Sequence, residues 1–330
     1  MQMRNPENIA EFDDLRVRFA SDGGVARAVD GLSLDIPRGN TVGLVGESGC
    51  GKSVAALTMM GLLPEGVASG AIRFQGGAGT VDLAAMPERA RAKLRGAEIA
   101  MVFQEPMTSL NPVLRIGAQL GDAVRLLGLS RAEVRGRVEE LLARVGVPAG
   151  VAGMYPHELS GGMRQRALIA LALARGPKLL IADEPTTALD ATIQMQILDL
   201  LSELRDGSGL SMLLISHDLG VIAEMADEVA VMYAGRAVER GNARDVLKHP
   251  AHPYTAGLIA SRPDLGRRGR LASIPGSVPD PAALPEHCRF FERCARRMDA
   301  CRGEYPREVQ LGGGHGVECR LYADGGEAHG

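Results

Sequence analysis

The stretch GESGCGKS at residues 46–53 constrains the fold of this chain more than any other stretch. It fits the pattern G-x-x-x-x-G-K-[ST], follows the apolar run Thr41–Val45 and opens a helical pattern. Such a loop turns consecutive backbone N–H groups toward phosphate groups, and the following helix adds the positive end of its dipole. We therefore expect a strand, a phosphate-binding loop and a helix in succession. The expected nucleotide contacts come from Gly46, Glu47, Ser48, Gly49, Cys50, Gly51, Lys52 and Ser53, with Lys52 at the β- and γ-phosphates and the Ser53 hydroxyl on Mg²⁺.

An acidic pair follows a second apolar run further along the chain. Residues 179–182, LLIA, are typical of a buried parallel strand, so Asp183 emerges at its carboxyl end, where ligands of open α/β sheets bind. We expect Asp183 to bind Mg²⁺. Glu184 is the candidate general base for the water that attacks the γ-phosphate.

The sequence LSGGMRQR at residues 159–166 stands about twenty residues before the acidic pair. Its Ser160, Gly161 and Gly162 precede a helical run, so their N–H groups and the helix dipole predict a second anion site. Together with the loop at residues 46–53 and the sequence LLIADEP, this stretch resembles the ATP-binding subunit of an ABC transporter. The resemblance covers roughly the first three quarters of the chain.

That resemblance implies roles for several further residues. Gln104, which ends MVFQ, is similar to the glutamine that senses the γ-phosphate and Mg²⁺. His217, in LLISHD, is similar to the histidine that contacts the γ-phosphate in the closed state. Asp190, in TALD, lies in a loop that couples two nucleotide sites. In the family, Ser160 and its glycines grip the γ-phosphate of ATP bound to the opposite subunit, which implies a dimer with two ATP molecules between its subunits.

Adenine recognition stays open between two interpretations. Phe19 lies where the family places an aromatic ring that stacks on the base, and the chain has few aromatic residues to offer. The alternative is a core residue on an alternating strand. In that case Val29 could provide the apolar contact with adenine.

Three separated stretches resemble one branch of the family, the oligopeptide, dipeptide and nickel importers. They are residues 103–112 (FQEPMTSLNP), 252–255 (HPYT) and 274–279 (IPGSVP). The branch implies a second, non-identical ATPase subunit, two transmembrane permease subunits and an extracytoplasmic substrate-binding protein. It places the chain on the cytoplasmic face of the cell membrane as a peripheral subunit. Because none of these residues contacts the cargo, import of nickel or another small solute is an alternative to peptide import.

The resemblance and the coarse pattern together give the expected architecture, an α/β P-loop NTPase of the ABC type. Two or three strands before Gly46 form an antiparallel edge, and alternating β/α units run through about Gly241, which implies a largely parallel sheet. A helical subdomain is expected over about residues 105–175, with helices at 116–127, 131–145 and 162–175 and Ser130 as an N-cap. We expect the nucleotide-binding domain over residues 1–250 and a C-terminal extension over residues 251–330.

Charge and hydropathy exclude some classes of protein. The formal net charge of −3 and the pI near 6.2 give no electrostatic reason to expect nucleic-acid binding. The longest apolar run, residues 167–174, is too short to span a bilayer, and residues 1–14 lack the pattern of a secretory signal. A soluble ABC ATPase that acts on ribosomes or DNA is a further alternative. Such proteins carry two ATPase units or long coiled coils, and this chain has neither.

Four of the five cysteines fall in the last fifth of the chain. Cys288, Cys294, Cys301 and Cys319 are separated by five, six and seventeen residues. A cytoplasmic location argues against structural disulfides, and a cluster of four thiols then indicates a metal. The lack of a C-x-x-C pair argues against a common zinc ribbon, whereas four thiolates suit a [4Fe–4S] cluster. The extension of some peptide-importer relatives holds such a cluster, so we expect iron–sulfur here, with zinc as the alternative.

Overall fold

The computed structural model describes residues 3, 5, 7–21, 24–63, 65–104, 109–187, 189–261 and 273–323. Two of the sequence motifs are only partly covered. Residues 105–108 of the branch motif and residue 188 of the TALD loop lie outside the described residues.

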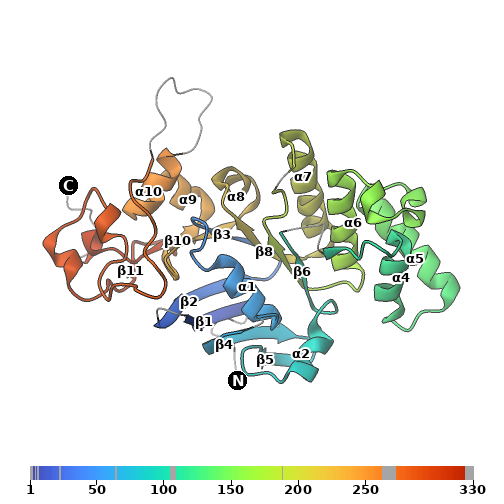
Figure 1. The fold of residues 1–330 in the computed structure, drawn as a ribbon, viewed down its shortest axis with the longest axis horizontal. Helices are drawn as coiled ribbons and strands as arrows, with labels where there is room; N and C mark the ends of the chain where they lie inside the picture. Colours follow the sequence, from blue (N-terminus) through green and yellow to red (C-terminus); the bar gives the residue numbers. More distant parts are fainter. Residues whose placement is uncertain are drawn as a thin grey trace.

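One sheet is antiparallel and lies at the bottom of the molecule in Figure 1. Its order is β2-β1-β4-β5, built from β1 (Asn8–Ser21), β2 (Gly24–Pro37), β4 (Val67–Gly76) and β5 (Gly79–Asp82). In β2 the apolar residues Leu32, Leu34 and Ile36 are buried and alternate with partly exposed ones, as a strand with one face on a core requires.

The expectation of two or three strands before Gly46 was incomplete. Three strands come before the loop, but only β1 and β2 are antiparallel; β3 (Thr41–Val45) belongs to the central sheet, and β4 and β5, which follow the loop, complete the antiparallel sheet. The region that forms β4 is rich in glycine and alanine, and only Ile72 and Phe74 in it are buried. Its alternation of apolar residues is therefore too weak to predict a strand.

The second sheet forms the centre of the molecule. Its order is β11-β12-β10-β9-β3-β8-β7-β6. The strands β9 (Glu228–Tyr233), β3 (Thr41–Val45), β8 (Ser211–Ser216), β7 (Leu179–Asp183) and β6 (Ile99–Val102) run parallel. β3, β7 and β8 are buried along their whole length, which agrees with their continuous apolar sequences. The antiparallel side consists of β10 (Arg236–Asn242), β12 (Gly316–Val317) and β11 (Val309–Gln310).

Helices cover this framework and extend it on one side. The parallel strands alternate with α1 (Lys52–Met60), α7 (Ala191–Ser208) and α8 (Leu219–Met225), while α2 (Glu88–Leu94) lies beside β5 (Figure 1). The helices α4 (Ile116–Arg125), α5 (Arg131–Arg144) and α6 (Gly161–Leu173) gather at the right of Figure 1. The three helices expected there are present, each ending one or two residues early. Ser130 caps α5 as expected, because its Oγ accepts the Glu133 N–H while the Glu133 carboxylate accepts the Ser130 N–H.

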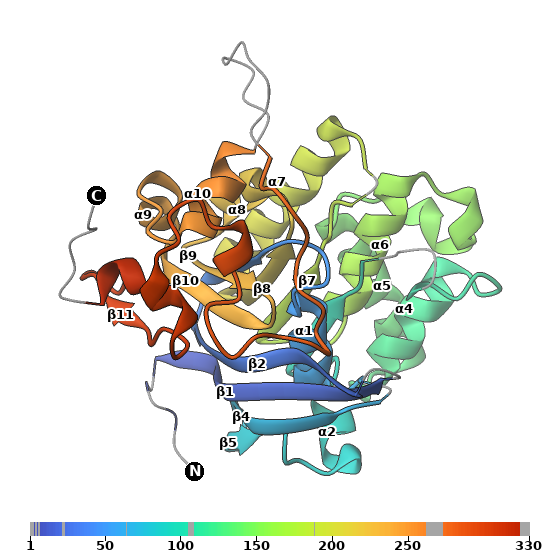
Figure 2. The ribbon, with the colours of Figure 1, turned by 60° about the vertical axis from the view of Figure 1, so that its left-hand side comes forward.

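The described residues beyond residue 250 pack along the antiparallel side of the central sheet (Figure 2). The helix α9 (Ala243–Lys248) leads into this region, which begins with α10 (Pro253–Ala260). Three short 3₁₀ turns follow, at Phe291–Arg293, Asp299–Arg302 and Arg320–Tyr322. The region's β12 pairs with β10 and so continues the central sheet.

Buried ionic groups join β10 to the residues beyond 250. The fully buried Glu239 of β10 accepts the N–H groups of Ala251 (2.7 Å) and His252 (2.9 Å), and His315 Nε2 lies 2.7 Å from its Oε1. Arg236 of β10 forms a two-point ion pair with Glu318.

Candidate functional site

The phosphate loop lies between β3 and α1, where the sequence placed it. Gly46 and Gly51 have positive φ angles of 155° and 106°. A Cβ at Gly46 would lie 2.2 Å from the Met232 carbonyl oxygen, and one at Gly51 would lie 2.3 Å from that of Ala28. Only glycine fits these two positions.

The basic side chain of the loop points inward. Lys52 is 6% exposed, and its Nζ donates to the carbonyl oxygens of Gly46 (2.7 Å) and Glu47 (3.0 Å). Cys50 is fully buried, and burial raises the pKa of its thiol, so it serves as a small, protonated filler of the loop.

Ser53, in the first turn of α1, meets Asp183, the last residue of β7. The Ser53 Oγ donates to Asp183 Oδ1 at 3.2 Å, although the residues are 130 positions apart. Asp183 is 4% exposed, and burial raises its pKa, with the charge of Glu184 adding to the rise and the Ser53 hydrogen bond opposing it. A hydroxyl and a buried carboxylate that favours a nearby cation are a donor set that fits Mg²⁺.

Glu184 is the centre of a second polar group. Its carboxylate accepts the Gln104 Nε2–H (3.1 Å) and the Thr187 Oγ1–H (2.8 Å), and His217 Nδ1 lies 3.1 Å from its other oxygen. The three residues that the sequence assigned to catalysis, Gln104, Glu184 and His217, thus follow the neighbouring strands β6, β7 and β8 and lie together.

The surroundings hold Glu184 in its charged form. Burial acts to raise its pKa, but the hydrogen bonds from Thr187 and His217 outweigh it, so the pKa lies below its usual range. Glu184 also has a φ of 48°, in the left-handed region that non-glycine residues rarely occupy and that costs free energy to maintain. The contact of Thr187 with Glu184 was not predicted from the sequence. The one feature that pointed to it is a hydroxyl three residues after the expected catalytic carboxylate.

The serine and glycines of the LSGG stretch open α6. Ser160 is its N-cap, and its Oγ accepts the Met163 N–H at 3.3 Å. Ser160 and Gly161 are exposed, whereas Gly162 is buried against α7, where a Cβ would lie 2.7 Å from Ile193 Cγ2. Asp190 caps α7 by accepting the Ile193 N–H at 3.0 Å. The stretch therefore lies next to the Asp190 loop of its own chain, with Ser160 and Gly161 exposed.

Phe19 lies on β1 at the margin of the core. It is partly buried and packs against the cluster that includes Val29, which is fully buried. A ring with one face in the core leaves the other available to a base, so stacking on adenine stays a prediction.

Two regions of the chain match known protein families. The family described as ABC transporter matches residues 29–187, and the family described as oligopeptide/dipeptide transporter, C-terminal region, matches residues 238–301. A putative peptide import ATP-binding protein of Brucella ovis is 51% identical over 325 residues, which cover 94% of this chain and 96% of that protein. The dipeptide transport ATP-binding protein DppD of Bacillus subtilis is 45% identical, covering 96% and 95%. The chain belongs to the ATP-binding proteins of oligopeptide and dipeptide ABC transporters.

Solved ABC structures confirm the fold class. A dimeric ATP-binding cassette in a post-hydrolysis state with ADP and phosphate has a TM-score of 0.64 at 25% identity, covering 71% of this chain and 99% of that one. The cbiO1 protein of Clostridium perfringens, part of an ABC transporter complex, has a TM-score of 0.63 at 29% identity, covering 74% and 92%. The ABC ATPase therefore has the expected α/β P-loop architecture with an antiparallel β subdomain.

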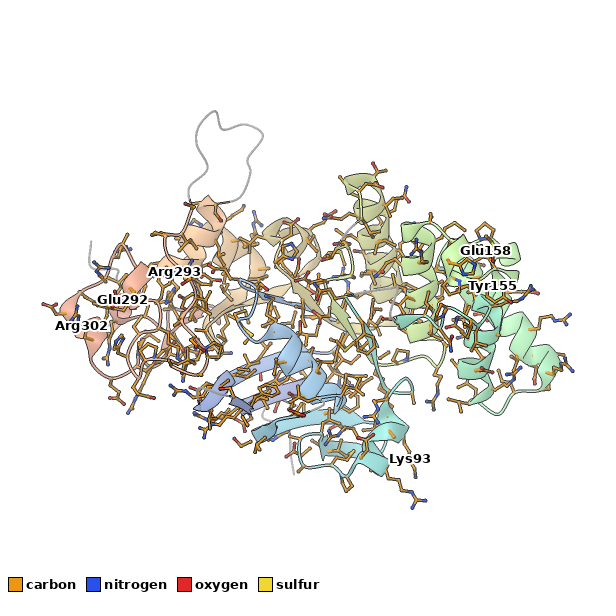
Figure 3. The ribbon with its side chains drawn as sticks, viewed as in Figure 1. Lys93, Tyr155, Glu158, Glu292, Arg293 and Arg302 are labelled. Atoms are coloured by element: carbon orange, nitrogen blue, oxygen red, sulfur yellow. The ribbon has the colours of Figure 1, made fainter. Side chains whose placement is uncertain are left out.

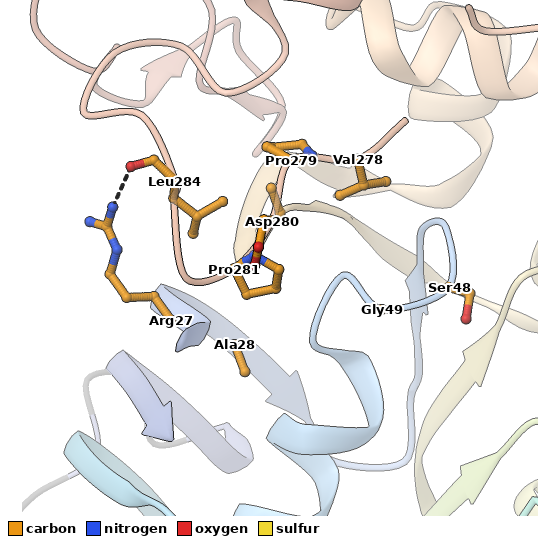
Figure 4. A pocket seen from close by; sticks show the side chains of 11 residues that line it. Arg27, Ala28, Ser48, Gly49, Val278, Pro279, Asp280, Pro281 and Leu284 are labelled. Carbon is orange, nitrogen blue, oxygen red and sulfur yellow. Dashed lines mark hydrogen bonds between the residues drawn. The ribbon is translucent and has the colours of Figure 1, made fainter. Parts of the chain in front are cut away.

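A cavity of about 250 Å³ lies between Ser48 and Gly49 of the phosphate loop of this ABC ATPase and part of its C-terminal extension. Figure 4 shows Ser48 and Gly49 on one side and the extension's Val278–Leu284 segment on the other, with β2 below. The extension is fastened to β2 here, because the Arg27 N–H donates to the Pro281 carbonyl (2.8 Å) and Arg27 Nη2 to that of Leu284 (2.6 Å). Nothing in the sequence analysis indicated that the extension reaches the loop.

The four cysteines of the extension lie near one another. The Cys288 N–H donates to the Cys301 carbonyl oxygen at 3.3 Å, and each of the four thiols is close enough to the other three to interact electrostatically. Burial raises the pKa of Cys288 to about 12 and that of Cys319 to about 11. All four are free thiols. Nevertheless, among the residues that the structure describes, no three or more His, Cys, Asp or Glu side chains are arranged to hold a metal ion.

The described part of the chain contains no helix that is both long enough and apolar enough to cross a membrane.

Proposed function

We propose that this ABC ATPase powers the import of peptides through a membrane complex. The observation that carries the proposal is the convergence of Gln104, Glu184 and His217 beside Ser53 and Asp183, on a chain whose end matches the oligopeptide/dipeptide C-terminal region. The curated relatives that match nearly the whole chain are named for peptide or dipeptide transport, which supports peptides as the cargo.

Each residue of the site has a role in the hydrolysis that we propose. Lys52 and the loop N–H groups bind the β- and γ-phosphates, and Ser53 and Asp183 would hold Mg²⁺, which would supply positive charge beside these phosphates. The ionised Glu184 orients a water molecule and accepts its proton as the oxygen attacks the γ-phosphorus and ADP leaves. His217 contacts the γ-phosphate, while Gln104 links the site to the helical part. Phe19 stacks on adenine.

The exposed start of α6 at Ser160 and Gly161 supports a dimer in which its N–H groups bind the γ-phosphate held by a partner subunit. We propose that the partner is a second, non-identical ATPase, with Asp190 coupling the two sites. Two permease subunits and an extracytoplasmic substrate-binding protein would complete the importer, with this chain on the cytoplasmic face of the membrane. The division into a nucleotide-binding domain and an extension near residue 250 belongs to the same proposal.

Transport by the reconstituted complex tests this function. The chain would be placed in lipid vesicles with its partner ATPase and permeases, and uptake of labelled dipeptides, longer peptides and Ni²⁺ measured with ATP supplied. Peptide uptake that disappears with Lys52→Ala is the expected result. Uptake of Ni²⁺ without any peptide uptake would contradict peptide import while leaving the ATPase intact.

For the four cysteines we propose a [4Fe–4S] cluster, with zinc as the alternative. Four free thiols gathered in a partly buried part of the extension fit the donor set of such a cluster, and binding would require them to lose their protons and draw closer. Protein purified without oxygen should be brown and contain about four irons per chain. Cys301→Ser should lose the metal. Zinc without iron in the anaerobic protein would refute the cluster, and a metal-free protein would refute both.

A further inference from the structure

The C-terminal extension holds one residue of the phosphate loop at two points. Arg293 Nη1 and Nη2 donate to the two carboxylate oxygens of Glu47, at 3.0 and 3.1 Å. The hydroxyl oxygen of Tyr254 accepts the backbone N–H of Glu47 at 2.9 Å. The side chain and the main chain of a loop residue are thus held by residues more than two hundred positions away. Figure 3 shows Arg293 beside Glu292 in the extension, far from the helical part that carries Tyr155 and Glu158.

The groups that hold Glu47 are themselves fixed. The side chain of Arg293 is 7% exposed, its Nε donates to the Pro275 carbonyl at 2.9 Å, and its Nη1 lies 3.3 Å from the Tyr233 hydroxyl. Tyr254 is fully buried, and its ring packs against those of Tyr233 and Phe290, with centroids 4.6 and 5.5 Å apart. Burial raises the pKa of Tyr254, so its hydroxyl keeps its proton. Neither side chain has freedom to follow a moving loop.

Because Glu47 lies in the phosphate loop, its pairing with Arg293 affects nucleotide binding. Glu47 is a negative charge in a loop whose function is to bind negative phosphates, and its carbonyl oxygen accepts a hydrogen bond from Lys52. Without a cation on its carboxylate, Glu47 would repel ATP. Arg293 neutralises that charge and fixes the orientation of the carboxylate, because the pair has two contact points.

We propose that Arg293 is a positioning residue for the phosphate loop. With Tyr254, it fixes and neutralises Glu47, so the C-terminal extension sets the affinity of the loop for ATP. This inference goes beyond the proposed peptide import, and it does not depend on the cargo or on a metal at the cysteines.

Binding of Mg·ATP to the isolated full-length chain, measured by calorimetry, tests the proposal. Arg293→Met leaves Glu47 charged and unpaired, and we expect the Kd for ATP to rise about tenfold or more. Adding Glu47→Gln should restore most of the affinity, because the repelling charge is removed together with its partner. Arg293→Lys keeps the charge but not the two-point contact, and should fall between the wild type and Arg293→Met.

Arg297→Met is the matched control. Arg297 lies four residues on in the same extension, is exposed, and stacks on Phe291 rather than contacting the loop. Its removal should leave the Kd unchanged. In the assembled ATPase, Arg293→Met should raise the KM for ATP in parallel with the Kd while kcat changes by less than about threefold, as expected for lost binding.

A folded Arg293→Met protein with the wild-type Kd would overturn the proposal, as would a Glu47→Gln double variant with no recovery. If Arg293→Met does not fold, Tyr254→Phe decides the question, because it removes only the acceptor of the Glu47 N–H and keeps the buried ring. We expect its Kd to rise severalfold, and an unchanged Kd would overturn the proposal.

Discussion

Replacing Glu184 by Gln isolates the function of one carboxylate in the site. The amide has nearly the same shape as the carboxylate. Its oxygen can still accept from Gln104 and Thr187, while its NH₂ group can donate to a neutral His217. The local structure should therefore persist, and the variant should bind ATP.

The change removes the ability to accept a proton. Loss of a general base costs about 10²–10⁴-fold in rate, which corresponds to a barrier about 3–5 kcal/mol higher. We expect the assembled transporter with Glu184→Gln to hydrolyse ATP slower by that factor and to accumulate a closed, ATP-bound complex. Phosphate release by the assembly and ATP retention on the same sample measure both effects.

Glu203→Gln is a suitable control, because Glu203 is an exposed carboxylate on α7 outside the site. Turnover by Glu184→Gln within a fewfold of the wild type would refute the assignment of the base. Loss of ATP binding in the isolated variant would instead show that the carboxylate holds the site together.

Two further predictions concern the signature stretch and the extension. Ser160→Arg should leave the Kd for ATP of the isolated chain nearly unchanged but abolish hydrolysis at the site that Ser160 completes on a partner; collapse of isolated binding with activity intact would contradict the proposed action in trans. Burial lowers the pKa of His252 to about 4, and its Nδ1 accepts the Tyr254 N–H. The imidazole of the unfolded chain titrates near pH 6.5, so the neutral, buried His252 contributes fully to the free energy of unfolding above that pH. Up to about 3 kcal/mol of this contribution is lost as the pH falls toward 4. Urea unfolding across pH 4–7 should show this loss as a slope of the unfolding free energy against pH, and a flatter slope for His252→Asn, whose side chain can keep the cap. The exposed His249→Asn is the control and should match the wild type. Equal slopes in all three proteins would refute the role of His252.

The parts of the fold that the sequence predicted are those determined by local patterns. β3 matches the expected strand residue for residue, because an apolar run before a glycine-rich loop leaves one arrangement of backbone that can bind phosphate. Ser130 was expected as a cap because it directly precedes a helical pattern, and the structure confirms it with a capping box that includes Glu133. In contrast, β4 has few apolar residues, and its strand conformation comes from pairing with β1, a contact between residues about sixty positions apart.

The candidate site also contains residues that local patterns predict and a contact that they do not predict. Gln104, Glu184 and His217 could be placed together from sequence, since each follows a parallel strand and the carboxyl ends of such strands meet at one edge. Thr187 was missed because its contact with Glu184 depends on the left-handed turn at φ 48°, which no residue type at that position announces.

The sequence shows one end of the contact between the extension and the loop, Glu47, but does not identify its partner. A glutamate inside a phosphate-binding loop requires a compensating cation, and Glu47 is visible in the sequence as such a residue. The chain has 37 Lys and Arg residues, however, and no spacing rule selects one that is 246 positions away. The selection comes from tertiary structure, because Phe290 and Arg293 pack against Tyr233 at the end of β9, and β9 lies beside β3, which leads into the loop. The extension therefore reaches Glu47 from the β9 side of the central sheet, through contacts that no local sequence pattern encodes.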